Sequence, residues 1–134
     1  ETAVVVMTAF GTTELAVAYA GQREQFGKPI GSFQAVKHIC ADMLTRAELA
    51  RGVVYAAGVT LDGRGVDDPG RMVAAAKITA GDAAKANGKA CIQVHGGMGF
   101  TAEVDAHLYL KRAIVLDTCF GSVDAHSEAV AITL

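Results

Sequence analysis

The sequence is poor in the residues that mark β-rich and disordered proteins. It has no Trp, two Pro and 6% aromatic residues, and 25 of its 134 residues are Ala. Ala is the best helix former and Pro the worst, so this composition favours helices and argues against all-β and collagen-like folds. With 51% hydrophobic residues the chain is too apolar to be disordered, and its length suits one domain with a core of its own.

Cysteine and unbalanced charge are also scarce. Cys40, Cys91 and Cys119 lie far apart, without the spacing of a zinc site or a redox dithiol. We therefore expect three small buried thiols in a reduced compartment, with a cytoplasmic location. The net charge of −2 is spread evenly along the chain, so we predict no nucleic-acid partner and no anionic membrane partner.

The amino-terminal segment is the most apolar part of the chain. Residue 1 is Glu, and the run that follows has neither a basic leader nor a small-residue cleavage site, so we do not interpret it as a signal peptide. Because Thr2–Gly21 contains Glu14 and four threonines, we expect a buried helix and not a membrane span. A buried helix at this position suggests that the chain begins inside a larger protein.

Helical spacing recurs between clear breaks, and no linker or repeat divides the chain. Three glycines and one proline between Gly21 and Gly31 predict a loop. The first predicted helix covers roughly residues 2–20, and the second runs from its N-cap, Ser32, to Leu61. The third starts at Asp68-Pro69 and runs to about Val94. A fourth starts near Ala102, and a short last helix has Ser122 as its cap. We predict one all-α domain over residues 1–134, an up-and-down antiparallel bundle of four main helices plus a short C-terminal helix.

Two loops contain residue types that packing alone does not require. In the segment 23–30, Arg23 could present its planar guanidinium to phosphate oxygens, with the Phe26 ring beside it, although an exposed arginine is often only a solvated charge. In the segment 92–101, three glycines within 96–99 would let a ligand approach the backbone, although a helix C-cap and turn explain the first two equally well. No Gly-Lys-Ser/Thr is present, so the second loop is not a phosphate loop of that kind.

Together and in this order, the loops resemble the C-terminal domain of the acyl-CoA dehydrogenase family. The matching stretches are Arg-Glu-Gln-Phe-Gly-Lys-Pro-Ile at 23–30 with Phe-Gln at 33–34, Ala-Asp-Met at 41–43, Ala-Lys at 76–77, Gln-Val-His-Gly-Gly-Met-Gly-Phe-Thr-Ala-Glu at 93–103 and Leu-Tyr-Leu-Lys-Arg at 108–112. The resemblance covers essentially the whole chain. It implies a fragment of a larger flavoprotein that also has an N-terminal helical domain and a middle β domain.

The resemblance also implies a cofactor and an assembly. Members of the family form tetramers around FAD, and the C-terminal bundle of one subunit reaches FAD bound mainly by a neighbour. Carried over residue by residue, the expected FAD contacts in this chain are Arg23, Gln25, Phe26, Gln34, Gln93, Gly96, Gly97 and Ser122. Homo-oligomers and hetero-oligomers are both compatible with this expectation.

The main departure from the family concerns the catalytic base. The family removes the α-proton of an acyl-CoA with a carboxylate while the β-hydride passes to the flavin. In many relatives this base is the Glu of a Tyr-Glu-Gly-Thr stretch, which falls here on Cys-Phe-Gly-Ser at 119–122, so Phe120 stands in its place. A similar pattern is typical of an actinobacterial branch. The base could lie on the helix upstream of Glu1 or on a partner subunit; Asp117 and Asp124 are less favoured.

The sequence thus predicts part of a FAD-dependent acyl-CoA dehydrogenase that oxidises the Cα–Cβ bond of an acyl-CoA thioester, as in fatty acid β-oxidation. The fragment alone should be inactive. The alternative is a non-catalytic FAD-binding and assembly subunit of a hetero-oligomeric enzyme. Glu103 and His107 are four residues apart but lack further ligands, so we predict no metal site. For His38, His95 and His126 we expect satisfied polar or surface roles.

Overall fold

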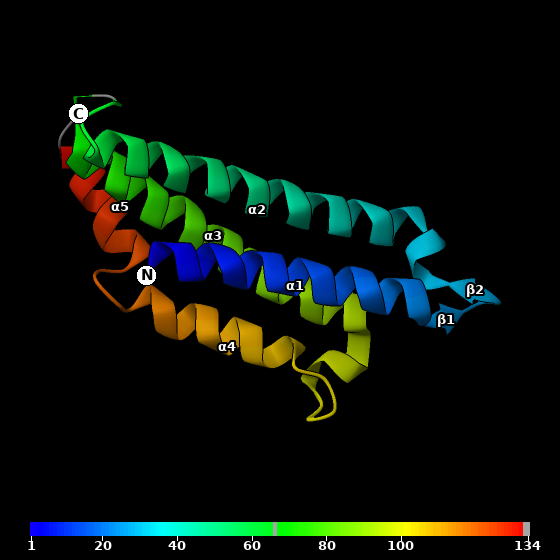
Figure 1. Cartoon of the computed structure of the whole chain (residues 1–134). Coiled ribbons are helices and arrows are strands. Elements are labelled where there is room, and N and C mark those ends of the chain that lie inside the picture. The colour runs from blue at the N-terminus through cyan, green and yellow to red at the C-terminus, as the bar shows by residue number, and fades with distance from the viewer. Residues whose placement is uncertain (66, 133–134) are drawn as a thin grey trace.

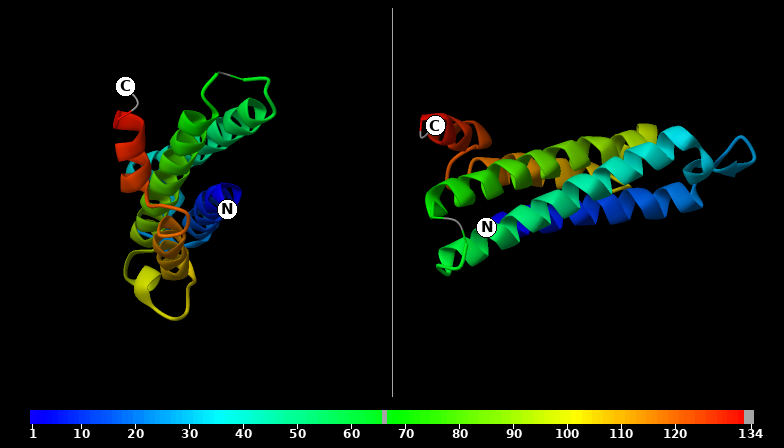
Figure 2. Two further views of the ribbon diagram at one scale, coloured as in Figure 1. Left: turned by 90° about the vertical axis from the view of Figure 1, so that its left-hand side faces the viewer. Right: turned by 90° about the horizontal axis from the view of Figure 1, so that it is seen from above.

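Five α-helices form an antiparallel bundle in the computed structural model, which describes residues 1–65 and 67–132 (Figure 1). The helices are α1 (Thr2–Gln22), α2 (Gln34–Leu61), α3 (Pro69–His95), α4 (Ala106–Asp117) and α5 (Val123–Ile132). Helices α1 to α4 alternate in direction along one axis. The shorter α5 lies across the end of the bundle where the amino terminus is found (Figure 2). The predicted all-α, up-and-down bundle is confirmed.

Helix α3 is the central element, because it packs against each of the other four helices. Most of its buried residues are Ala or Gly, so neighbouring backbones can come close, as Leu110 does at Gly88. The buried core forms two clusters, which share α1, α2 and α3; one includes Val5, Ala47 and Ala80, and the other includes Ala16, Met43 and Cys91. The alanine content that predicted helices therefore also sets the close packing of the bundle.

Helix α1 is long and apolar enough to span a membrane by length and composition alone, so Glu14 and the threonines do not exclude a span on those grounds. Its place in the structure is that of a core helix. It packs on α2, α3 and α4, and 44% of its most apolar window is buried inside the bundle. Thr8, Thr12 and Thr13 are buried and donate hydrogen bonds to backbone carbonyls in the preceding turn, which satisfies their hydroxyl groups.

The predicted start of the third helix is confirmed. The side chain of Asp68 accepts a hydrogen bond from the Arg71 amide at 2.9 Å, and Pro69 occupies the first turn. Ser122 likewise caps α5, since its hydroxyl accepts a hydrogen bond from the Ala125 amide at 3.2 Å.

Two predicted helix starts are wrong. Ser32 does not cap α2, because it ends a short 3₁₀-helix, η1 (Ile30–Ser32), and the N-cap residue is Phe33 without a side-chain cap. The fourth helix begins at Ala106 and not near Ala102, because residues after α3 form a second 3₁₀-helix, η2 (Gly96–Phe100), followed by a turn. In both places a tight 3₁₀ turn interrupts the chain before the α-helix starts.

Candidate functional site: a groove between the hairpin and the end of α3

The predicted loop after α1 contains a small β-hairpin. Strands β1 (Glu24–Gln25) and β2 (Lys28–Pro29) pair antiparallel around Phe26 and Gly27. Both turn residues have positive φ, 55° for Phe26 and 77° for Gly27, as a two-residue type I′ hairpin turn requires. Because the strands are so short, the turn fixes where the residues on either side of it lie.

The Phe26 ring is 92% exposed at the tip of this hairpin. It meets the Phe33 ring edge to face, with centroids 6.1 Å apart, and the Lys28 ammonium lies 4.4 Å from the Phe33 centroid. These contacts fold the hairpin back towards the start of α2.

The glycine-rich segment ends α3 and turns the chain. Gly96 has a φ of +60° and follows the last helical residue, His95. Gly99 is buried, and a Cβ added there would lie 2.7 Å from the Ile92 carbonyl oxygen. By contrast, a Cβ added at Gly96 or Gly97 would meet nothing within 4 Å. Gly99 is therefore required for packing within the bundle, while the backbone at Gly96 and Gly97 faces open space.

The hairpin and the end of α3 enclose a shallow groove of about 480 Å³. Four of the predicted FAD contacts line it: Arg23, Gln25, Gly96 and Gly97. No acidic side chain is among the lining residues, and Arg23 is exposed and has no ion pair within the described part of the chain. The remaining lining residues are Tyr19, Ile30, Val94, His95 and Met98.

The other predicted contacts do not line this groove. Phe26 lies at the hairpin tip, Gln34 is exposed in the first turn of α2, and Gln93 is exposed in the last turn of α3. Ser122 lies at the opposite end of the bundle, at the start of α5 (Figure 1). A role for Ser122 in FAD binding would therefore require a second region of contact.

His95 is the groove residue that sequence reasoning left out. It is 4% exposed, stacks on the Tyr19 ring with centroids 4.1 Å apart, and its Nδ1 lies 2.8 Å from the Cys91 carbonyl oxygen. This histidine was expected to have a satisfied polar or surface role. Among residues 1–65 and 67–132 only its Nδ1 is paired, and the signal that could have drawn attention to it is its place directly before Gly96.

At the opposite end of the bundle, the loop between α4 and α5 presents Phe120. Its φ is +55° and its ring is 85% exposed. Buried Lys77 donates hydrogen bonds to the carbonyls of Leu116 and Cys119, and His126 Nε2 lies 3.0 Å from the Phe120 carbonyl oxygen. An aromatic residue at positive φ is strained, so these contacts are what hold the loop in this shape.

Neither Asp117 nor Asp124, the two candidate substitutes for the base, lies in an enclosed site as an unpaired carboxylate. Asp117 Oδ1 accepts a hydrogen bond from the Val123 amide at 3.2 Å, and its Oδ2 lies 3.4 Å from Lys85 Nζ. Asp124 is exposed in the first turn of α5, where a carboxylate stabilises the helix dipole. These positions suit capping and helix-stabilising roles.

The cysteines are free, and Cys91 is buried as expected, while Cys40 and Cys119 are partly buried. Burial raises the pKa of the Cys91 thiol to about 11, with a smaller contribution from Cys40. Burial also raises the pKa of Cys40. A raised pKa keeps a thiol protonated, so neither sulfur is activated as a nucleophile. Within the residues that the structure describes, no three His, Cys, Asp or Glu side chains gather as metal ligands do.

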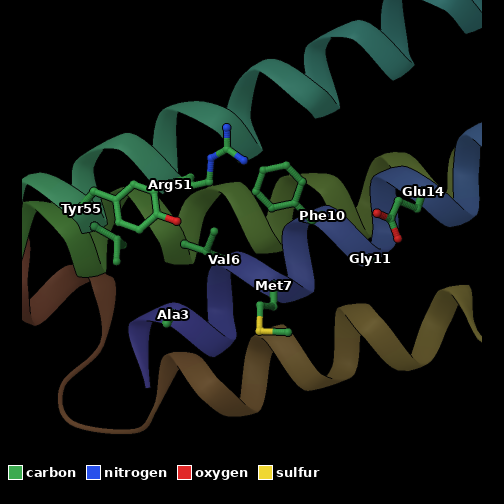
Figure 3. Close-up of a pocket in the computed structure, with 9 residues that line it drawn as sticks. Ala3, Val6, Met7, Phe10, Gly11, Glu14, Arg51 and Tyr55 are labelled. Atoms are coloured by element: carbon green, nitrogen blue, oxygen red, sulfur yellow. The ribbon is translucent and has the colours of Figure 1, made fainter.

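A second groove, of about 500 Å³, lies between α1 and α2 (Figure 3). Its lining is mainly apolar, and the Arg51 guanidinium lies 5.5 Å from the Phe10 ring centroid. The labelled side chains come from α1 on one side and α2 on the other: Ala3, Val6, Met7, Phe10, Gly11 and Glu14 from α1, and Arg51 and Tyr55 from α2. None of the predicted FAD contacts lies in this groove.

The sequence model of one family, described as "Acyl-CoA dehydrogenase, C-terminal domain", matches residues 2–134. The chain belongs to the acyl-CoA dehydrogenase family. Acyl-CoA dehydrogenase FadE34 of Mycobacterium tuberculosis is 59% identical over 103 residues, which are 76% of this chain and 14% of that protein. Acyl-CoA dehydrogenase IpdE2 of Mycolicibacterium smegmatis is 41% identical over 100 residues, which are 75% of this chain and 30% of that protein.

Two solved structures contain a domain with the same fold. An FAD complex of PigA superposes with a TM-score of 0.90 at 30% identity, over 98% of this chain and 34% of that one. Butyryl-CoA dehydrogenase from Megasphaera elsdenii superposes with a TM-score of 0.90 at 28% identity over the same shares. This chain thus spans about a third or less of these relatives' lengths and corresponds to the C-terminal helical domain of an acyl-CoA dehydrogenase family flavoprotein.

Proposed function

We propose that this domain helps to bind FAD in an oligomeric acyl-CoA dehydrogenase that oxidises the Cα–Cβ bond of an acyl-CoA thioester. The observation that carries the proposal is the convergence of Arg23 and Gln25 with Gly96 and Gly97 in one groove, from segments more than 70 residues apart. Relatives named as acyl-CoA dehydrogenases and a solved FAD complex support the same cofactor.

The groove suits a dinucleotide for three reasons. The Arg23 guanidinium has no competing carboxylate in the described part of the chain, so it can pair with phosphate oxygens. The bare backbone at Gly96 and Gly97 leaves room for a ligand to approach. Tyr19, whose ring stacks on that of His95, adds aromatic surface beside the polar groups. When bound, FAD would supply the hydride acceptor; the residues of this chain bind and orient it.

The open shape of the groove is consistent with a ligand held mainly by another subunit. The segments that line the groove also carry large exposed hydrophobic side chains, Phe26 at the hairpin tip at 92% and Phe100 at the end of η2 at 76% exposure. Exposed apolar surface of this kind marks contact with other protein surfaces. We therefore place the groove at the edge of an intersubunit FAD site, in a homo- or hetero-oligomer, with a tetramer as the family expectation.

Replacing Arg23 tests the proposal. In the intact oligomeric flavoprotein, Arg23→Ala should weaken FAD binding about tenfold, because a charge-assisted hydrogen bond to phosphate contributes about 1.5–3 kcal/mol and exposure reduces it. The measurement is flavin content after gel filtration, together with the FAD dissociation constant. Arg64→Ala is the matched control, since Arg64 is exposed and its ion pair is with Asp62, far along the chain from the groove residues. Equal flavin loss in both variants, or none in either, would contradict the proposed role.

A second candidate function is a non-catalytic FAD-binding and assembly subunit. It is favoured by Phe120, which has no group able to take a proton at the position predicted for the family's base. If this candidate is correct, the protein purified without other subunits keeps FAD but shows no bleaching of flavin absorbance when acyl-CoA is added. Bleaching by that protein alone would instead show that the base lies in the same polypeptide.

A further inference from the structure

In the buried ring of His95, Nδ1 takes part in a hydrogen bond within the fold, whereas Nε2 is available to a ligand. A carbonyl oxygen can only accept a hydrogen bond, so the 2.8 Å contact with the Cys91 carbonyl places the hydrogen of the neutral ring on Nδ1. In that tautomer Nε2 carries a lone pair and can only accept. The stacked Tyr19 ring, inclined by 27°, fixes the plane in which this lone pair points.

Nε2 has no hydrogen-bond partner among residues 1–65 and 67–132, whereas every fully buried side-chain nitrogen or oxygen described there has one. Nε2 must therefore retain some exposed surface, even though the whole residue is only 4% exposed. His95 lines the groove with Arg23 and Gly96, so the groove is the space into which that surface would open. A well-ordered acceptor in such a place is a feature of a binding site.

We propose that His95 Nε2 accepts a hydrogen bond from a neutral donor of the bound dinucleotide, a sugar hydroxyl or an exocyclic amino group, and so sets its position in the groove. The inference rests on the proposed function. Arg23 and His95 would thus bind different groups of the dinucleotide. Arg23 pairs with the phosphates, whereas the lone pair on Nε2 would repel a phosphate oxygen and therefore favours an O–H or N–H group. The hydrogen bond from Nδ1 to the Cys91 carbonyl keeps the ring hydrogen on Nδ1 and so leaves the lone pair on Nε2.

Two isosteric substitutions separate this role from a structural one. A glutamine side chain can place its amide oxygen near the position of Nε2, whereas an asparagine side chain can place its amide nitrogen near that of Nδ1. His95→Gln therefore keeps the acceptor in the groove and gives up the bond to Cys91. His95→Asn keeps the bond to Cys91 and gives up the acceptor.

The experiment measures the FAD dissociation constant of the intact oligomeric flavoprotein after removal and re-addition of FAD. We expect His95→Asn to bind FAD about 3- to 10-fold more weakly than wild type, the loss of one neutral hydrogen bond, and His95→Gln to stay within about twofold. The reverse order would show that His95 acts only through Cys91 and would overturn the proposal. Equal affinities in the two variants, whether lowered or not, would overturn it too.

Arg23→Ala measured alongside keeps the two claims apart. If it weakens FAD binding while the His95 variants are equal, the proposed function stands and the role of Nε2 fails. If it has no effect, the proposed function itself fails. Should a His95 variant not assemble, wild-type protein labelled with ¹⁵N-histidine decides the question. The Nε2 signal of His95 shifts on FAD addition if the bond forms, and an unchanged signal overturns the proposal.

Discussion

Asn87 joins three helices through a single side chain. It is fully buried in α3; its Nδ2 donates to the carbonyls of Met43 at 2.8 Å and Ala9 at 3.1 Å, and its Oδ1 accepts from Arg46 Nε at 2.8 Å. A further contact reaches Thr13 Oγ1 at 3.2 Å. A buried amide with all its groups paired fixes the register of α1 and α2 on α3, because any sliding would leave a polar group unsatisfied.

Asn87→Ala should destabilise the folded protein by about 2–4 kcal/mol, since it removes the hydrogen bonds to Arg46, Met43 and Ala9 and leaves a small cavity. The measurement is chemical denaturation of the intact protein. Lys89→Ala, on an exposed position of the same helix, is the control and should change stability by less than about 0.5 kcal/mol. Similar effects of the two substitutions would contradict the assigned role of Asn87.

The buried thiol of Cys91 predicts a pH-dependent reactivity. Its pKa of about 11 lies above the ordinary value of 9.0, so the folded protein keeps the thiol protonated where an unfolded chain has begun to ionise it. Alkylation by iodoacetamide at pH 8 should therefore spare Cys91 until the protein is denatured, as peptide mass spectrometry can show. The same shift means that stability decreases as the pH rises above about 9. Rapid labelling of the native protein would contradict this account.

The helices differ in how far the sequence could predict their ends. Asp68-Pro69 is a local signal, and its cap hydrogen bond to Arg71 needs no other part of the fold. Ser32 carries an equally good local signal but lies in a 3₁₀ turn, because Phe33 is held by Phe26 and Lys28 from the hairpin. Likewise, the helix after α3 starts four residues later than predicted, because residues 96–100 form η2.

The residues of the candidate site also differ in how far the sequence could predict them. Arg23, Gln25, Gly96 and Gly97 were predicted through the family resemblance, and the structure places all four around one groove. The orientation of His95 could not be predicted, because it depends on stacking with Tyr19, a residue on another helix. Asn87 could not be assigned for the same reason, since its partners are 41 to 78 residues away.

The packing of α3 against α4 depends on Gly88. A Cβ at this position would lie 3.0 Å from the Leu110 Cα, so Gly88→Ala should push α4 outward and cost about 1–3 kcal/mol. Gly52 is also within a helix, but a Cβ there would meet nothing within 4 Å, so Gly52→Ala should instead stabilise by about 0.5–1 kcal/mol. Thermal unfolding of both variants checks the pair; shifts of the same sign would contradict the packing.

At the scale of the whole molecule, the two ends of the bundle carry different features. The hairpin and the end of α3 form the groove at one end, while the Phe120 loop and α5 lie at the other (Figure 1). A single FAD bound in the groove would therefore not reach Ser122 across the length of the bundle. If Ser122 does contact FAD, each domain contributes to two different flavin sites, which fits an oligomer with shared sites.

A crystal structure of the FAD-bound full-length oligomer would show whether the groove of this domain holds part of FAD. We expect the Arg23 guanidinium to lie within about 3 Å of a phosphate oxygen of FAD, and the backbone at Gly96 and Gly97 to contact the same molecule. An FAD-bound oligomer in which Arg23 points into solvent and no part of FAD enters the groove would contradict this expectation.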